Sequence, residues 1–201
     1  MIRNLLQLLL LVLFLTMPCL AQENPEWEVF GGYSLQRSGV REFFKSTPSL
    51  YTFRDRTAWL GGWDFALTEN VNRWFGGTLD LSGHYKTRDF LGSTNRERIH
   101  SVLYGPRFFQ RIHGLVPFGH VLIGLAHADR AVTSVGPHEK DNAFAVAPGG
   151  GLDLNLGKKA AIRVFQAEYF RTNLRTEVFG TSPNGYRASF GVVFYLGKTK
   201  Q

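Results

Sequence analysis

Charged and polar side chains recur at every second position inside apolar stretches of this sequence. In residues 74–85, WFGGTLDLSGHY, the side chains of Asp80, Ser82 and His84 alternate with leucine, glycine and tyrosine. Carboxylate, hydroxyl and imidazole groups on one face can form ion pairs and hydrogen bonds, or can pass protons. Successive side chains of a β-strand point to opposite faces, so this spacing predicts a strand with one apolar and one polar face.

The same alternation occurs in residues 57–67, 143–156 and 186–196, which predicts a common polar inner face. The expected inner set is Asp64, Asp80, His84, Arg107, His120, Asp153, Glu168 and Arg187. Because this set has both signs of charge, we expect a network of ion pairs in the lumen of a barrel, where unpaired charges would cost several kcal/mol each. The functional alternative is a narrow proton or ion path, or a gate that His84 and His120 open as the pH falls.

Catalysis would need a nucleophile beside a base. His100 and Ser101 are the one adjacent pair, but neighbours on a strand point to opposite faces. A serine on a neighbouring strand could instead pair with His84 or His100, and the sequence does not reveal such a pairing. Because no histidine pair has a spacing typical of metal ligands, we expect neither a metal site nor a cofactor.

Eight predicted strands position these side chains. They cover residues 27–35, 57–67, 74–85, 99–110, 116–126, 143–156, 160–170 and 186–196. The short connections are residues 68–73, 111–115 and 157–159, and the long ones are residues 36–56, 86–98, 127–142 and 171–185. Since all the long connections fall at one end of an up-and-down meander, the pattern is typical of a transmembrane barrel with short turns inside and long loops outside.

Several residues do not fit regular strands. Pro106, Pro117 and Pro148 each remove a ladder hydrogen bond, and we expect bulges to accommodate them, particularly at Pro148. Arg163 and Glu168 are five residues apart and cannot both face the lumen of a regular strand. Either a bulge separates them, or Arg163 lies at the membrane rim.

The chain begins with a stretch typical of an export signal. Arg3 precedes an apolar run, and a small residue, Ala21, ends the segment. We therefore expect residues 1–21 to be a cleaved signal peptide and residues 22–201 to be a single barrel domain. Cleavage would remove Cys19, the sole cysteine, so disulfides cannot stabilise the mature chain.

The predicted long loops are rich in cations interleaved with aromatic residues, and the formal net charge of the chain is +7. Such a rim suits the phosphates of outer-membrane lipids and lipopolysaccharide. The alternative is that these loops are simply solvated. The cations expected to contact anionic lipid are Arg37, Arg41, Lys45, Arg54, Arg56, Lys86, Arg88, Arg96 and Arg98.

The sequence resembles the small eight-stranded outer-membrane β-barrel family, the OmpA/OmpX-like barrel domain. The resemblance covers nearly the whole mature chain and rests on the segments EVFGGYSL, WFGGTLDLSGHY, SVLYGPRFF, VPFGHVLIGLAHA, GGGLDLNL and GYRASFGVVFYLG. It implies an all-β fold, an eight-stranded antiparallel up-and-down transmembrane β-barrel in the outer membrane.

The expected function is a structural or surface-interaction role without catalysis. Its expected partners are outer-membrane lipids and lipopolysaccharide, with an unknown external or periplasmic protein partner and no nucleic acid. One alternative is a lipid-modifying barrel enzyme. The other is a soluble periplasmic ligand-binding barrel of lipocalin-like shape, which would have its apolar face inside and its polar face outside.

Overall fold

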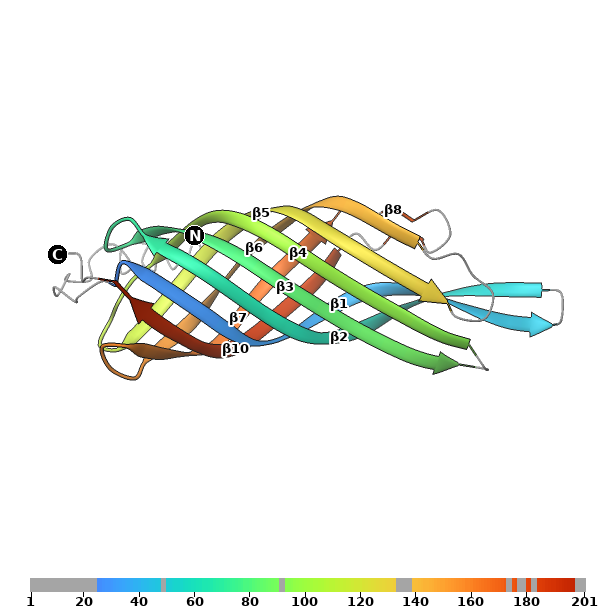
Figure 1. Ribbon diagram of the computed structural model, residues 1–201, viewed down its shortest axis with the longest axis horizontal. Coiled ribbons are helices and arrows are strands. Elements are labelled where there is room, and N and C mark those ends of the chain that lie inside the picture. Colours follow the sequence, from blue (N-terminus) through green and yellow to red (C-terminus); the bar gives the residue numbers. More distant parts are fainter. Residues whose placement is uncertain are drawn as a thin grey trace, which may run out of the picture.

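The computed structural model is a closed barrel of eight antiparallel strands (Figure 1). It describes residues 25–47, 50–90, 93–132, 139–172, 175–176, 180–181 and 184–197; side chains are described for 25–37, 57–87, 94, 96–129, 140–172 and 185–197. The barrel strands are β1 (Trp27–Thr47), β2 (Leu50–Asn70), β3 (Phe75–Phe90), β4 (Ser93–Phe109), β5 (Leu115–Val132), β6 (Glu139–Asn155), β7 (Ala160–Thr172) and β10 (Asn184–Leu196). The predicted signal peptide lies outside the described residues.

Each strand pairs with the strand before it and after it, and β10 closes the barrel against β1. Trp27 at the start of β1 lies opposite Leu196 at the end of β10, so the first and last strands begin and end at the same end of the barrel. This arrangement confirms the predicted up-and-down fold. No helix long and apolar enough to span a membrane occurs in the described part of the chain.

The three predicted short turns are present at this end of the barrel. Between β4 and β5, His113 and Gly114 both have positive φ angles, of 47° and 90°, as a tight primed hairpin turn requires. Between β2 and β3, the side-chain oxygen of Asn72 accepts hydrogen bonds from the backbone N–H groups of Trp74 and Phe75. Gly157 supplies the positive φ of the turn between β6 and β7.

The prediction of long loops was largely wrong, because the barrel strands continue through much of these segments. Residues 36–47 and 50–56 pair across β1 and β2 up to Thr47 opposite Leu50, and this hairpin projects beyond the other strands (Figure 1). Backbone pairing needs no apolar face, so strands can continue outside the membrane without the alternation that marked their inner parts. A small separate sheet of β8 (Arg175–Thr176) and β9 (Gly180–Thr181) occupies part of the last connection.

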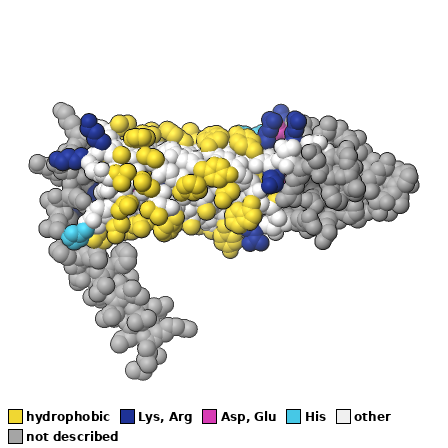
Figure 2. Space-filling model, turned by 90° about the horizontal axis from the view of Figure 1, so that it is seen from below, with side chains coloured by type: hydrophobic (Ala, Val, Ile, Leu, Met, Phe, Trp, Pro, Cys, Tyr) yellow, Lys and Arg dark blue, Asp and Glu magenta, His cyan; other side chains and the backbone are white. Residues whose placement is uncertain are grey.

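Side chains alternate between a buried interior and an exposed apolar exterior, as predicted. On β3, Asp80 is 1% exposed whereas Tyr85 is 41% exposed. On β10, Phe190 and Phe194 face outward while Arg187 is buried. The space-filling view shows apolar side chains over the middle of the described surface and Lys and Arg at its two ends (Figure 2). A polar interior within an apolar exterior is the reverse of a lipocalin-like barrel and suits a lipid environment.

A bulge on β7 explains how Arg163 and Glu168 both face inward. Val164 and Phe165 are consecutive exposed residues, and the register of β7 shifts against both β6 and β10 at this point. Because of the extra residue, both charged side chains point into the barrel. Of the two predicted explanations for Arg163, the bulge is therefore confirmed and the position at the membrane rim is wrong.

The bulge expected at Pro148 was wrong, and the register shows none at Pro106 or Pro117 either. Pro148 lies opposite Val121 of β5, and the register between β6 and β7 is the same on both sides of it. Pro106 likewise lies opposite Gly77 of β3, with unshifted register toward β5 around it. A proline lacks the N–H toward only one neighbour, so pairing is interrupted on that side without an inserted residue.

Candidate functional site

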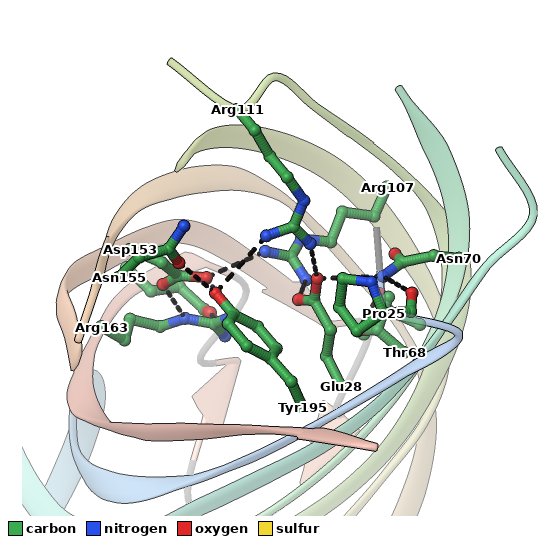
Figure 3. A network of polar contacts seen from close by, with 12 residues as sticks. Pro25, Glu28, Thr68, Asn70, Arg107, Arg111, Asp153, Asn155, Arg163 and Tyr195 are labelled. Atoms are coloured by element: carbon green, nitrogen blue, oxygen red, sulfur yellow. Dashed lines mark hydrogen bonds and ion pairs between the residues drawn. The ribbon is translucent and has the colours of Figure 1, made fainter. Parts of the chain in front are cut away.

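Arg107 lies at the centre of a buried polar cluster near the end of the barrel where β1 begins (Figure 3). Its guanidinium group donates hydrogen bonds to Glu28 on β1, at 2.6 Å, and to Asp153 on β6, at 3.0 Å. All three residues are at most 2% exposed. Buried ion pairs between non-neighbouring strands hold the wall together across the lumen, and they are strong only when both partners are present.

Arg111, in the turn after β4, closes this cluster toward the barrel end. It pairs with Glu28 and lies 3.5 Å from the hydroxyl of Tyr195, which in turn donates to Asn155. Asn70 on β2 donates to the other side of the cluster, to Glu28, at 3.0 Å. These groups come from different sides of the barrel and point toward one another in its middle (Figure 3).

Arg163 connects this cluster to a second one deeper in the barrel. Its guanidinium group donates to both carboxylate oxygens of Asp153 and to Gln166, at 2.7 to 3.0 Å. Gln166 then donates to Glu168 at 3.1 Å. Phe118 packs between Arg107 and Arg163, with centroid distances of 4.2 and 4.5 Å to the two guanidinium carbons. These favourable cation–π contacts place an aromatic ring against both guanidinium groups.

Arg187 organises the second cluster. It pairs with Glu168 through its Nε, and it donates to Ser82 at 2.8 Å and to Asp80 at 2.9 Å. His120 lies 2.8 Å from the other oxygen of Glu168. A single continuous chain of contacts therefore links Glu28 on β1, near one end of the barrel, to Asp80 on β3 through residues of β4, β6, β7 and β10.

Asp64 and His84 are buried beside this chain but not joined to its ion pairs. Neither carboxylate oxygen of Asp64 has a hydrogen-bond partner among the described residues. His84 contacts the hydroxyl of Ser34 at 2.8 Å through Nε2, while its Nδ1 has no partner in the same set. The structure thus brings six of the eight expected lumen residues into one network and leaves these two at its side.

Several network members were missed in the sequence. Glu28 stands at the start of the first strand, where too few residues precede it to establish an alternation, and Arg111 was assigned to a turn. Arg163 was ambiguous because the bulge changes its parity. The one feature of the sequence that could have pointed to the missed members is that they are polar residues near strand ends or bulges. They are Glu28, Asn70, Arg111, Gln166 and Tyr195.

Buried side chains occupy the interior along the part of the barrel whose side chains are described. Toward the outer end, the polar chain is followed by two packed apolar clusters. Leu60, Leu103 and Leu122 in these clusters are at most 1% exposed. Side chains therefore fill an eight-stranded barrel, as its small diameter allows.

The candidate histidine–serine pairs are not arranged for lipid chemistry. His100 faces outward, whereas Ser101 faces inward and lies 2.7 Å from Ser82. His84 does contact Ser34, but both are fully buried inside the barrel, where a membrane lipid cannot reach them. No group of three or more His, Cys, Asp or Glu side chains suited to a metal ion occurs among the residues with described positions.

The predicted lipid-contact cations lie on strands rather than on loops. Arg37, Arg96 and Arg98 are exposed, and Lys86 is half-buried. Arg41, Lys45, Arg54, Arg56 and Arg88 lie outside the residues whose side chains are described. The described cations surround the outer end of the apolar belt, where lipid headgroups would lie.

No family model and no curated protein match this chain. Solved structures do match. Ail, the attachment invasion locus protein of Yersinia pestis, is 18% identical with a TM-score of 0.52, over 85% of this chain and 99% of Ail. Neisserial surface protein A is 10% identical with a TM-score of 0.57, over 85% of this chain and 97% of its own.

The outer membrane protein OprG from Pseudomonas aeruginosa is 13% identical with a TM-score of 0.53, over 87% of this chain and 98% of its own. At these identities the similarity concerns the fold. Together with the closed sheet, the polar interior and the apolar outer belt, it shows that the chain is a small eight-stranded β-barrel of the outer-membrane type.

Proposed function

We propose that this outer-membrane barrel has a structural and surface-interaction role, without catalysis, and that its outer rim contacts phosphate-bearing lipids, including lipopolysaccharide. The observation that carries the proposal is the abrupt change on the outer wall from exposed apolar side chains to exposed arginines. Trp59 on β2 and Val102 on β4 are 52% and 54% exposed on this wall. The exposed Arg37 lies opposite Trp59 on β1, and the exposed Arg98 and Arg96 lie beyond Val102 on β4, toward the outer end. Cations at this level attract anionic headgroups.

The filled interior supports a structural role rather than transport. The buried ion pairs connect strands across the interior of the barrel. We further propose that residues 1–21 act as a cleaved export signal and that residues 22–201 form the mature domain. A solved complex of Ail with the heparin analogue sucrose octasulfate shows that a protein with this fold binds a polyanion, which makes a soluble polyanion the second ligand to test.

Binding of the purified barrel to lipopolysaccharide and to its dephosphorylated form tests the lipid contact. We expect tighter binding to the phosphorylated form, and we expect added salt to reduce the difference because exposed charges are screened. Replacing Arg37, Arg96 and Arg98 together by glutamine should weaken this preference. The matched control replaces Arg73, Lys158 and Lys159, which lie in turns at the opposite end. Equal binding to both forms by the unmodified barrel would contradict the proposal.

A further inference from the structure

A row of polar side chains crosses one side of the outer wall on strands β4 to β6, and a glycine of β3 lies beside it. Gly83 lies opposite His100, His100 opposite His127, and His127 opposite Asn142. Directly opposite residues on neighbouring strands have Cβ atoms about 5 Å apart. The two imidazoles and the amide therefore lie side by side on the face that carries the apolar belt.

Hydrogen bonds and ring contacts orient this row. Nδ1 of His127 lies 2.7 Å from the side-chain oxygen of Asn142, which can only accept, so Nδ1 carries the proton. The free ring nitrogen of His127 is then Nε2. On the other side, the indole N–H of Trp63 donates to the hydroxyl of Tyr85 at 3.2 Å, and the Tyr85 ring meets the His100 ring edge-on at 5.4 Å.

The next row toward the outer end of the barrel carries two exposed cations. Tyr85 lies opposite Arg98, Arg98 opposite Asp129, and Asp129 opposite Lys140. Arg98 and Lys140 are exposed, and Asp129 between them is half-buried. The row thus has an excess of positive charge.

On the opposite side of the polar row, the wall is apolar. Val102, Leu125 and Phe144 stand two positions along their strands from His100, His127 and Asn142, and they are 54%, 64% and 51% exposed. A molecule that lies along this wall therefore meets apolar side chains, then imidazoles and an amide, then cations. That order matches acyl chains followed by a phosphate-bearing headgroup.

We propose that this wall, formed by Tyr85, Arg98, His100, His127, Lys140 and Asn142, is a discrete binding site for the phosphate of an outer-leaflet lipid. The inference rests on the proposed function and assigns its phosphate contact to one side of the barrel. Arg98 and Lys140 donate to the phosphate, and the imidazoles of His100 and His127 lie in the adjacent row, between these cations and the apolar wall. The acyl chains lie on Val102, Leu125 and Phe144, which favours a membrane lipid over a soluble anion.

The wall around β7 and β10 differs. There Tyr169 and Tyr186 form an aromatic pair with centroids 5.6 Å apart, next to the exposed Arg171. Among the described strand residues, the outward-facing histidines are confined to β4 and β5. Arg171 on β7 and Arg37 on β1 therefore provide exposed cations outside the proposed site.

Native mass spectrometry of the barrel in detergent, titrated with lipid A and with dephosphorylated lipid A, tests the site. We expect one bound lipid A per barrel with a clear preference for the phosphorylated form. The double variant Arg98→Gln with Lys140→Gln should lose about tenfold in affinity for lipid A. The double variant Arg37→Gln with Arg171→Gln removes the same charge elsewhere and should lose at most about twofold.

The outcomes separate the site from the general rim contact. Equal losses of affinity for lipid A in the two double variants would overturn the localised site and would still agree with a general contact along the rim. No preference for phosphate in the unmodified barrel would overturn both. Displacement of lipid A by inorganic phosphate or sucrose octasulfate at comparable concentration would overturn the membrane lipid as the occupant. An unchanged heat-dependent gel mobility verifies that each variant is folded.

Discussion

Arg107 is the residue on which the ion pairs at the inner end of the barrel converge. Replacing it by alanine removes one of the two ion pairs of Glu28 and one of the two of Asp153, and leaves Arg111 and Arg163 as their ion-pair partners in a buried environment. We expect the free energy of unfolding in lipid vesicles to fall by about 3 to 5 kcal/mol, because removing one partner of a buried ion pair leaves the other charge poorly compensated. Arg37→Ala, an exposed control, should change it by less than about 0.5 kcal/mol. An unchanged unfolding midpoint for Arg107→Ala would show that the network is not stabilising.

Asp64 and Asp80 are a matched pair of buried carboxylates with different surroundings. Asp80 accepts a hydrogen bond from Arg187 at 2.9 Å, whereas Asp64 has no partner among the residues whose side chains are described. Asparagine is nearly isosteric and uncharged. We therefore expect Asp80→Asn to lower the free energy of unfolding by about 3 kcal/mol and Asp64→Asn to leave it unchanged or to raise it. Denaturant titrations of both variants at neutral pH measure the difference, and an equal loss in both would refute it.

At the scale of the strands, close backbone approach limits which residues the wall accepts. A Cβ atom at Gly124 of β5 would lie 2.1 Å from the carbonyl oxygen of Val102 on β4, so the backbone would have to move. Gly31 of β1 has no atom within 4 Å of its Cβ position. We expect Gly124→Ala to reduce stability by about 1 to 3 kcal/mol and Gly31→Ala to have little effect. Urea unfolding midpoints compare the two variants, and similar midpoints would contradict the close approach.

The bulge on β7 acts at the same scale. It places Arg163 and Glu168 on the inner face together, which allows Arg163 to link the two polar clusters through Gln166. Without the extra residue, one of the two charges would face the lipid. An irregularity of one strand is thus what makes the polar chain continuous.

At the scale of the whole molecule, the filled interior predicts the electrical behaviour of the barrel. Polar side chains from opposite sides meet in the middle of the barrel, and two buried apolar clusters lie further along the interior in the described region. We expect the reconstituted protein to give no steady current in planar bilayers, at neutral or at mildly acidic pH. Stable open-channel steps would contradict this, and steps that appear only in acid would support a histidine-controlled gate. Heat-dependent migration in gels verifies that the tested protein is folded.

Much of this architecture followed from the sequence because lipid on one side of a wall requires an apolar side chain at every second position. Because of that constraint, the spacing of residues predicted the strands of the apolar belt and the three short turns. It also predicted which side chains of β2, β3, β6 and β10 face inward. Outside the belt the constraint ends. The strand extensions around β1 and β2 were therefore not visible in the pattern, although backbone pairing continues there.

The sequence by itself determined that this protein is an antiparallel barrel with a charged interior, because alternation and connection length are local properties of the chain. Only the tertiary structure decided which charges meet. Glu28 and Arg107 are 79 residues apart, and Asp80 and Arg187 are 107 apart, so their pairing depends on closure and stagger of the sheet. The register of the consecutive pairs β3–β4, β4–β5 and β5–β6 brings the outward-facing side chains of these strands into one surface. The direction of Arg163 depends on a bulge that residue type alone does not specify.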